Sequence, residues 1–221
     1  MKKIAIFDLD GTLLDTIADL AASTNFALAR LGYPTHPTDA YRFMVGNGIN
    51  KLFERALPEG SKTPEEVLRV RTLFLQHYDV HNADLSCPYP GIPQLLEELQ
   101  QAGVHLAVAS NKYISATQKL VAHFFSNVVF DEVLGQREGV PAKPDPTIVG
   151  EILQHTGFQT DEVLYIGDSG VDMHTALNAG VDACGVTWGF RPRAELEEGA
   201  PQFIVDRPEE ILHLCTQCAN S

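Results

Sequence analysis

Apolar residues follow one another along this chain in blocks of different spacing, and each spacing predicts a different element. Residues 4–7 are all apolar and are followed at once by an acidic, glycine-containing stretch, which is typical of a short buried strand that ends in a loop. From Ile17 to Leu31 the apolar positions instead recur every three or four residues, as on one face of a helix, and Gly32 supplies a C-terminal stop.

Helical patterns continue beyond this stop. Two shorter helices are predicted over residues 38–44 and 49–57, separated by the Gly-Asn-Gly break at 46–48. Residues 63–66, Thr-Pro-Glu-Glu, have the form of a capping box with proline at the first helical position. A long helix should therefore begin there and end near residue 81.

Strands and helices alternate in the rest of the chain, beyond a connection marked by two prolines and a glycine within residues 86–91. Together with the first strand, this alternation predicts a Rossmann-like parallel sheet with helices on both faces. The predicted strands cover residues 104–109, 128–133, 163–166, 181–186 and 203–205, and the predicted helices cover 92–102, 114–125, 146–156, 171–179 and 208–214.

The chain is therefore predicted to have an α/β fold with an inserted α-helical domain. Residues 16–83 carry helical patterns alone and interrupt the alternation directly after the first strand. We expect them to lie at the C-terminal edge of the sheet, while residues 1–15 and 84–221 form the α/β core.

Composition limits the partners and the compartment. The 221 residues are 44% apolar, enough for a substantial core, and 29 acidic against 16 basic residues give a net charge of −13. Because this charge repels other polyanions, we expect no nucleic-acid partner and no membrane partner. No apolar run approaches the roughly 20 residues of a membrane span, and the first is too short for a signal peptide, so a cytoplasmic protein is expected. An anionic substrate would need local positive charge.

Four cysteines are too few and too irregularly spaced for a disulfide framework. Cys215 and Cys218 form a lone CxxC pair near the C-terminus, with His213 close by. A zinc site would need a second pair of ligands, so we interpret the pair as two thiols on one side of a final helix.

Charged and hydroxyl residues follow the predicted strands at the ends where open α/β sheets bind ligands. Taken singly, each has an ordinary structural explanation, such as a turn, a helix start or a surface charge. Together they form a set that suits one chemistry. The set comprises Asp8, Asp10, Ser110, Asn111, Lys112, Lys143, Asp168 and Asp172.

These residue types suit phosphoryl transfer from a phosphate monoester. The carboxylate of Asp8 can attack phosphorus and form an aspartyl-phosphate. Carboxylates are hard oxygen ligands, so Asp8, Asp168 and Asp172 predict a Mg²⁺ site. Lys143 and the metal would offset the negative charge of the phosphate and the nucleophile, and Ser110 can donate a hydrogen bond to a phosphate oxygen.

Asp10 lies two residues after Asp8, so in an extended segment both side chains face the same side. From that position Asp10 can protonate the leaving oxygen and then activate water.

Residues 7–16, Phe-Asp-Leu-Asp-Gly-Thr-Leu-Leu-Asp-Thr, resemble the first motif of the haloacid dehalogenase superfamily of phosphohydrolases. Ser110 and Lys143 resemble its second and third motifs, and residues 167–172 resemble its fourth. The resemblance spans almost the whole chain. It implies a Mg²⁺-dependent phosphatase in which the helical insertion is a mobile cap.

The resemblance also implies a role for each matched residue. Asp8 would be the nucleophile, and Asp10 would be the acid and base, with its backbone carbonyl also on the metal. Asp8 and Asp168 would bind the metal directly, with Asp172 as a nearby or water-mediated ligand. The predicted substrate-binding residues of the core are Gly11, Thr12 and Asn111.

Within the superfamily, the chain resembles the phosphoglycolate phosphatases most, through residues 45–48, 110–112 and 187–191. Arg42 and Asn47 are the candidates for contacts with the substrate beyond its phosphate, because the planar fork of an arginine suits a carboxylate. The alternative is that Arg42 only covers a helix surface.

Other functions within the superfamily stay open: another small-metabolite or pyrophosphate phosphatase, or a sugar phosphomutase. Asp10 disfavours true dehalogenases and phosphonate hydrolases, which lack this second aspartate. A signalling receiver would carry its phosphorylated aspartate on a later strand, and an inactive binding protein would have lost motif residues that are all present here. The expected partner is a small anionic phosphate ester, and the chain is expected to be a monomer or homodimer.

Overall fold

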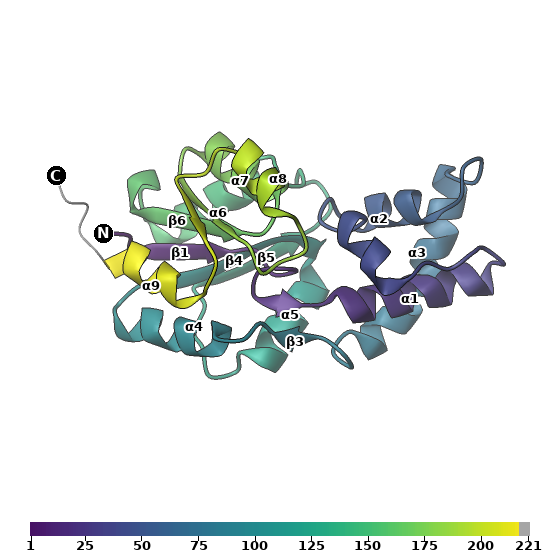
Figure 1. Cartoon of the computed structure of the whole chain (residues 1–221), viewed down its shortest axis with the longest axis horizontal. Helices are drawn as coiled ribbons and strands as arrows, with labels where there is room; N and C mark the ends of the chain where they lie inside the picture. Colours follow the sequence, from purple (N-terminus) through teal and green to yellow (C-terminus); the bar gives the residue numbers. More distant parts are fainter. Residues whose placement is uncertain (217–221) are drawn as a thin grey trace.

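Six parallel strands form one sheet in the core of the molecule (Figure 1). The computed structural model describes residues 1–216. Strand β1 lies between β4 and β6, so the carboxyl ends of these three strands are neighbours. In spatial order the strands are β5 (Glu132–Gln136), β4 (His105–Tyr113), β1 (Ile4–Phe7), β6 (Val163–Gly167), β7 (Asp182–Val186) and β8 (Phe203–Val205).

Helices cover both faces of this sheet and explain the continuous apolar run of β1. Ala5 and Phe7 pack into one cluster, while Ile4 and Ile6 pack into another on the opposite face. The first cluster includes residues of α4 (Ile92–Gln101), α5 (Ile114–Phe124) and α9 (Glu209–Thr216); the second includes residues of α6 (Thr147–Thr156), α7 (Gly170–Ala179) and α8 (Arg193–Glu198).

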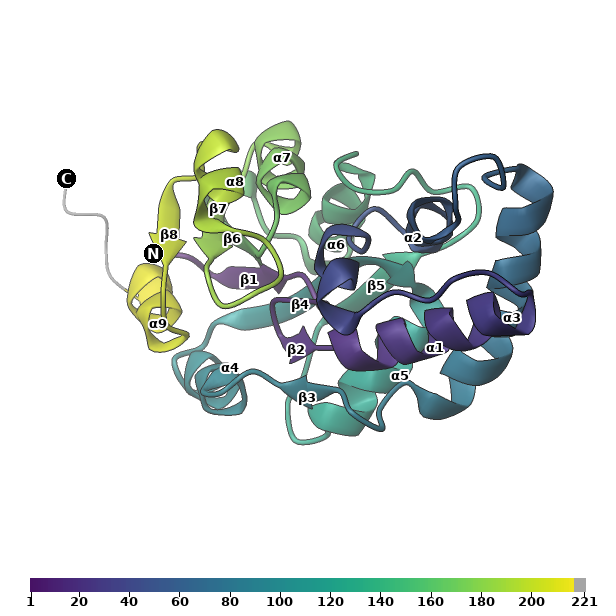
Figure 2. The same ribbon diagram turned by 45° about the vertical axis from the view of Figure 1, so that its right-hand side comes forward.

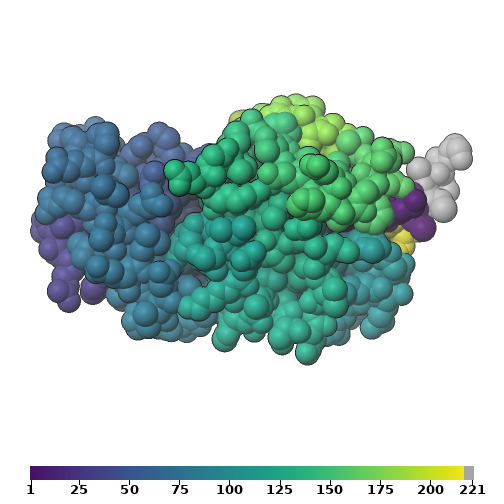
Figure 3. Space-filling view, turned by 180° about the vertical axis from the view of Figure 1, so that it is seen from behind, coloured from purple at the N-terminus to yellow at the C-terminus, as the bar shows by residue number. Residues whose placement is uncertain are grey.

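Four helical elements between β2 and β3 form a separate layer beside the sheet (Figure 1). They are α1 (Ile17–Arg30), η1 (Thr38–Phe43), α2 (Ile49–Ala56) and α3 (Pro64–His81), and we call them the cap. Their apolar faces form a third cluster, which Ala116 and Phe190 of the core extend. From behind, the blue cap and the green core form two lobes (Figure 3).

Two short strands, β2 (Leu14–Asp15) and β3 (Cys87–Pro88), join the cap to the core as an antiparallel pair (Figure 2). Asp19, at the start of α1, strengthens this junction. Its buried carboxylate accepts hydrogen bonds from the backbone N–H groups of Leu85 and Ser86 and from the Ser86 hydroxyl, at 2.7–3.1 Å. Both ends of the cap are thereby tied at one place.

Several predicted boundaries were wrong. The predicted strand over 128–133 is instead β5, which starts at Glu132. The chain bends just before it at Asp131, whose carboxylate accepts a hydrogen bond from the backbone N–H of Leu106. The predicted strand over 104–109 runs on to Tyr113 as part of β4. Helix α8 and the β2–β3 pair were not predicted, and η1 is a 3₁₀ rather than an α-helix.

Among the described residues, no helix has the length and apolar character that crossing a membrane requires. The described part of the CxxC pair, Cys215, is a buried free thiol in α9. Cys218 lies outside the described residues, so the interpretation of that pair stays a prediction.

Candidate active site

Asp8 lies directly after β1, where the sheet ladder positions its backbone through a 2.9 Å hydrogen bond to the carbonyl of Ile166. Its side chain is buried, and its Oδ1 lies 3.0 Å from Nζ of Lys143. Among the described residues, no hydrogen-bond partner contacts its other carboxylate oxygen. Asp8 therefore has one oxygen held by a cation and one left for chemistry.

Lys143 is the buried cation at the centre of the site. Its Nζ lies 2.7 Å from Oδ1 of Asp172, 2.9 Å from the carbonyl of Ala109 and 3.0 Å from the hydroxyl of Tyr165. Burial alone would lower the pKa of Lys143, but Asp172 and Asp8 more than offset it and hold this pKa well above its usual range. Lys143 is therefore a permanent positive charge among carboxylates.

Three buried carboxylates surround this single ammonium: Asp8, Asp168 and Asp172. One oxygen of each lies within 4.8 Å of the others. Burial, with the charges of Asp172 and Asp10, raises the pKa of Asp8 to about 7, although Lys143 acts in the opposite direction. Burial and the charges of Asp172 and Asp8 raise the pKa of Asp168 well above its usual range. The site thus has more negative charge than Lys143 can balance.

This donor set fits Mg²⁺, which prefers carboxylate oxygens and would relieve the excess of negative charge. Asp168 is positioned by the backbone N–H of Phe190, which donates to its Oδ2 at 2.7 Å. Asp172 differs, because Lys143 binds its Oδ1 and the Ser169 hydroxyl binds its Oδ2 at 2.6 Å. Asp8 and Asp168 are therefore better placed to ligate the ion, with Asp172 fixing Lys143.

Asp10 lies two residues after Asp8, and its carboxylate is held by two side chains. Its Oδ1 accepts a 2.6 Å hydrogen bond from the hydroxyl of Thr16, and both of its oxygens lie 3.0 Å from Nζ of Lys112. Its side chain is about one-sixth exposed, at 17%. A carboxylate in this position can exchange protons with a group in the cleft.

Ser110 and Asn111, on β4, have different surroundings. The Ser110 oxygen accepts from the backbone N–H of Lys112 at 3.2 Å, which leaves its own O–H to donate to a substrate. Asn111 donates to the carbonyls of Gly46 and Lys143, at 3.0 and 3.1 Å, and accepts from the N–H of Lys143. The amide of Asn111 therefore connects the cap loop to the segment that carries Lys143.

Gly11 has to be a glycine. Its φ is +89°, and a Cβ there would lie 2.2 Å from Oδ2 of Asp168. The next residue, Thr12, has a buried hydroxyl with no hydrogen-bond partner among the described residues, while its carbonyl accepts from Nε1 of Trp188 at 3.0 Å. Neither Gly11 nor Thr12 is among the residues that line the cleft between the core and the cap, so their substrate-binding role stays a prediction.

A cleft between the core and the cap contains about 510 Å³ of empty space. Asp8, Asp10 and Ser110 line its core side. The cap side is mostly apolar and consists of Leu20, Val45, Gly46, Gly48, Ile49, Leu52, Phe74 and Tyr78.

Comparison with known proteins agrees with this geometry. The family model for haloacid dehalogenase-like hydrolases matches residues 5–186. The chain belongs to this family. It is 34% identical to a phosphoglycolate phosphatase of Vibrio parahaemolyticus over 96% of this chain and 95% of the relative, and 33% identical to one of Haemophilus influenzae over 95% and 96%.

A crystal structure from Lactobacillus delbrueckii subsp. bulgaricus has a TM-score of 0.91 at 35% identity and covers 97% of this chain and 99% of that one. The family, these relatives and the site together identify the chain as a phosphatase, a hydrolase of phosphoric monoesters. The resemblance read from the sequence is thereby confirmed, as is the α/β fold with a parallel sheet.

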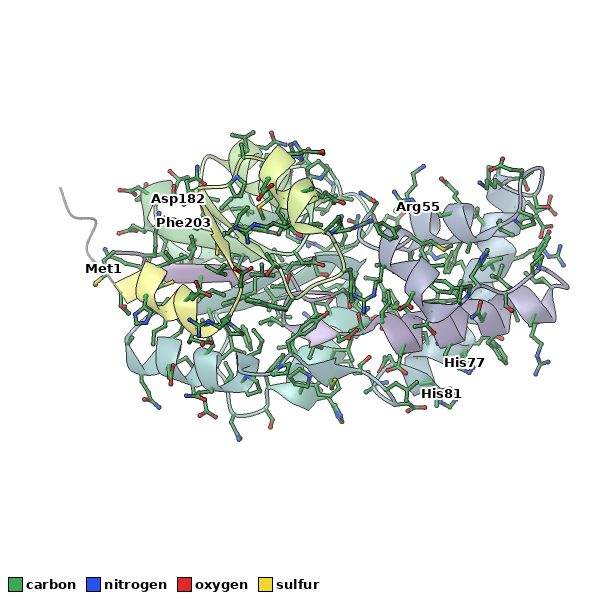
Figure 4. All side chains as sticks on the ribbon, in the orientation of Figure 1. Met1, Arg55, His77, His81, Asp182 and Phe203 are labelled. Carbon is green, nitrogen blue, oxygen red and sulfur yellow. The ribbon has the colours of Figure 1, made fainter. Side chains whose placement is uncertain are left out.

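Arg42 and Asn47 lie outside the lining of the cleft in this haloacid dehalogenase-like hydrolase. Arg42 donates to the carbonyl of Gly189 at 3.4 Å, with its guanidinium 5.9 Å from the ring centroid of Phe190. Asn47 accepts a 2.7 Å hydrogen bond from Arg55, an exposed residue of α2 (Figure 4). Their substrate-binding role stays a prediction from the sequence.

Three residues of the site carried no assigned role in the sequence: Tyr165, Lys112 and Tyr78. Tyr165 lies inside an apolar strand, where no sequence pattern distinguishes a hydrogen-bond partner of Lys143 from an ordinary core residue. Lys112 follows Ser110 and Asn111, and its position after a predicted strand was the one sequence signal that it could be part of the site. Tyr78 lies in a long helix, where its position gave no such signal.

Proposed function

We propose that this phosphatase hydrolyses phosphoglycolate, or an equally small phosphomonoester with a second anionic group, through an aspartyl-phosphate on Asp8. The observation that carries the proposal is the surroundings of Asp8: one oxygen faces Lys143, the other has no described partner, and the residue opens into the cleft. Phosphoglycolate is proposed as the substrate because the curated relatives are named phosphoglycolate phosphatases.

In the first step, an oxygen of Asp8 attacks phosphorus and the ester bond breaks. The leaving oxygen takes a proton from Asp10, which lines the same cleft. Lys143 and the free O–H of Ser110 hold the phosphoryl oxygens while charge develops on them. The products of this step are an alcohol and the aspartyl-phosphate.

In the second step, Asp10 takes a proton from a water molecule, whose oxygen attacks phosphorus. The bond between phosphorus and the Asp8 oxygen breaks, which releases inorganic phosphate and restores both carboxyl groups to their starting states. Asp10 is suited to both steps because it faces the cleft without belonging to the Lys143 cluster.

Mg²⁺ bound by Asp8 and Asp168 would supply positive charge that lets a phosphate dianion approach an ionised nucleophile. The chain's own residues prepare this arrangement. Phe190 N–H orients Asp168, and Asp172 with Tyr165 fixes Lys143. The cap would move about the β2–β3 junction and close on the bound substrate. This closure would exclude water from the site.

The partner we propose is a small anionic ester rather than a nucleic acid or a membrane, in agreement with the net charge of −13. The cytoplasm, where phosphorylated metabolites occur, is the proposed compartment.

The test is hydrolysis of a panel of phosphomonoesters, pyrophosphate and hexose phosphates, ranked by kcat/KM with Mg²⁺ and with a chelator. Phosphoglycolate should rank first, and the chelator should abolish turnover. A hexose phosphate whose phosphoryl group reappears on another hydroxyl, rather than as inorganic phosphate, would identify a mutase and overturn the proposal.

A further inference from the structure

Lys112 is a buried lysine with a single acidic partner among the described residues. Its side chain is 4% exposed, and its Nζ donates to both oxygens of Asp10 at 3.0 Å. It also lines the cleft. Buried ammonium groups are rare unless they are paired, and this one is placed where a substrate would lie.

Tyr78 reaches the same cleft from the cap. It belongs to α3, it is fully buried, and its ring centroid lies 5.0 Å from Nζ of Lys112. Its hydroxyl has no hydrogen-bond partner among the described residues. A buried O–H without an acceptor costs free energy, and an acceptor that entered the cleft would remove this cost.

The other cap residues that line the cleft offer no charge and no side-chain donor; they are Leu20, Val45, Gly46, Gly48, Ile49, Leu52 and Phe74. The arginines near the cap loop bind elsewhere: Arg42 contacts the carbonyl of Gly189, and Arg191 contacts that of Val45 at 2.9 Å. Lys143 is enclosed by Asp8 and Asp172. Lys112 is therefore the cation in the cleft that a second anionic group of the substrate can reach.

We infer that Lys112 and Tyr78 form the subsite for the carboxylate of the substrate, an inference that rests on the proposed function. The ammonium of Lys112 exchanges one oxygen of Asp10 for a carboxylate oxygen, and the O–H of Tyr78 donates to the same carboxylate. One group comes from the core and the other from the cap. The substrate carboxylate thereby joins the two parts of the enzyme across the cleft.

The subsite also limits the length of the substrate. Lys112 contacts Asp10, which would protonate the leaving oxygen, so the carboxylate has to lie close to that oxygen. One carbon between the ester oxygen and the carboxylate, as in phosphoglycolate, satisfies this requirement. A homologue with one more methylene, 3-phosphooxypropanoate, should be hydrolysed with a lower kcat/KM.

Tyr78→Phe gives the cleanest test, because it keeps the ring and removes only the hydroxyl. The kcat/KM ratio of phosphoglycolate to ethyl phosphate, which has the same two carbons but no carboxylate, should fall roughly tenfold, as expected for a lost hydrogen bond to a charged group. Tyr89→Phe is the matched control, since its hydroxyl is also buried and unpartnered among the described residues but it does not line the cleft. The control should leave the ratio unchanged.

Lys112→Met should lower the same ratio by roughly 10–100-fold, with Lys62→Met, an exposed lysine that pairs with Glu59, as its control. A wild-type preference for phosphoglycolate that survives in both Tyr78→Phe and Lys112→Met would overturn the subsite and leave the proposed function intact. A wild-type enzyme that hydrolyses the two esters equally well would overturn the proposed function and the subsite together.

Discussion

The Nζ of Lys143 lies 2.7 Å from Oδ1 of Asp172, and neither side chain is more than 2% exposed. The same ammonium lies 3.0 Å from Asp8. One lysine therefore compensates two buried carboxylates, and a third, Asp168, has an oxygen within 4.8 Å of an oxygen of each.

Replacing Lys143 by methionine should destabilise the protein strongly. Three carboxylates would remain buried without a cation, and breaking a buried ion pair typically costs about 3–5 kcal/mol. Urea unfolding of the metal-free variant would measure this loss. Mg²⁺ should restore part of the stability, because it supplies the missing charge, and Lys119→Met, on the surface, should change little. A Lys143→Met protein as stable as the wild type in chelator would contradict this account.

Replacing Asp8 or Asp10 by asparagine should cause different defects in catalysis. Asp8→Asn removes the nucleophile, so no phosphoenzyme should form. Asp10→Asn keeps the nucleophile and removes the proton donor, which should lower the rate by roughly 10²–10⁴-fold. Acid quenching with a labelled substrate would detect the phosphoenzyme in the wild type and in Asp10→Asn alone. Near-normal turnover by Asp8→Asn would rule out the mechanism.

Mg²⁺ should stabilise the protein more as the pH rises. The pKa of Asp8 is raised from 3.8 to about 7 by burial, and that of Asp168 is raised well above its usual range, also by burial. A carboxyl group with a raised pKa in the folded state stabilises the fold below its unfolded pKa, and this contribution is lost as the pH rises through the folded pKa. The metal-free protein should thus lose stability between about pH 4 and pH 7 from Asp8.

The ionised carboxylates that cause this loss are the form that binds the cation, so the difference in Tm with and without Mg²⁺ should grow over the same range. Thermal unfolding in chelator and in Mg²⁺ at several pH values would measure it. A difference that stays constant from pH 5 to pH 8 would show that these groups are not the ligands.

Arg42→Ala tests whether this residue binds the substrate or supports the cap. The guanidinium contacts the carbonyl of Gly189 and the ring of Phe190, both in the core. We expect kcat/KM for phosphoglycolate and for ethyl phosphate to fall by the same modest factor, about two- to fivefold, because a weak contact between cap and core is lost. A selective loss on phosphoglycolate would instead support the direct role that the sequence suggested.

The sequence predicted the site to the extent that parallel strands align their carboxyl ends. Asp8, Ser110 and Asp168 each follow an apolar run, and the order of β4, β1 and β6 in the sheet brings them together. The apolar run of β1 predicted burial on both faces, which the two clusters confirm.

Contacts between distant segments were not predictable in this way. Lys112 and Asp10 are 102 positions apart, and neither the spacing nor the type of the residues indicates that they pair. The same holds for Asn111 and Gly46, which connect the core to the cap. The sequence names the chemical groups at the strand ends, whereas the packing of segments that are distant in the sequence decides which of them meet.

Gly11→Ala should lower kcat by roughly 10²-fold while leaving most of the fold intact. Two effects act at this position. A φ of +89° is unfavourable for alanine, which costs about 1–2 kcal/mol, and the new Cβ would lie 2.2 Å from Oδ2 of Asp168. Gly32→Ala separates them, because Gly32 has a similar φ of +78° but nothing within 4 Å of a Cβ.

Both variants should therefore lose a similar amount of stability from the backbone, as measured by urea unfolding. Gly11→Ala alone should displace Asp168, and a misplacement of about 1 Å in a catalytic site lowers kcat by roughly 10²-fold. Its stabilisation by Mg²⁺ should also weaken, because Asp168 is one of the two carboxylates best placed to ligate the ion. If Gly11→Ala kept normal kcat and normal stabilisation by Mg²⁺, the close approach of Gly11 to Asp168 would have no part in holding the metal site.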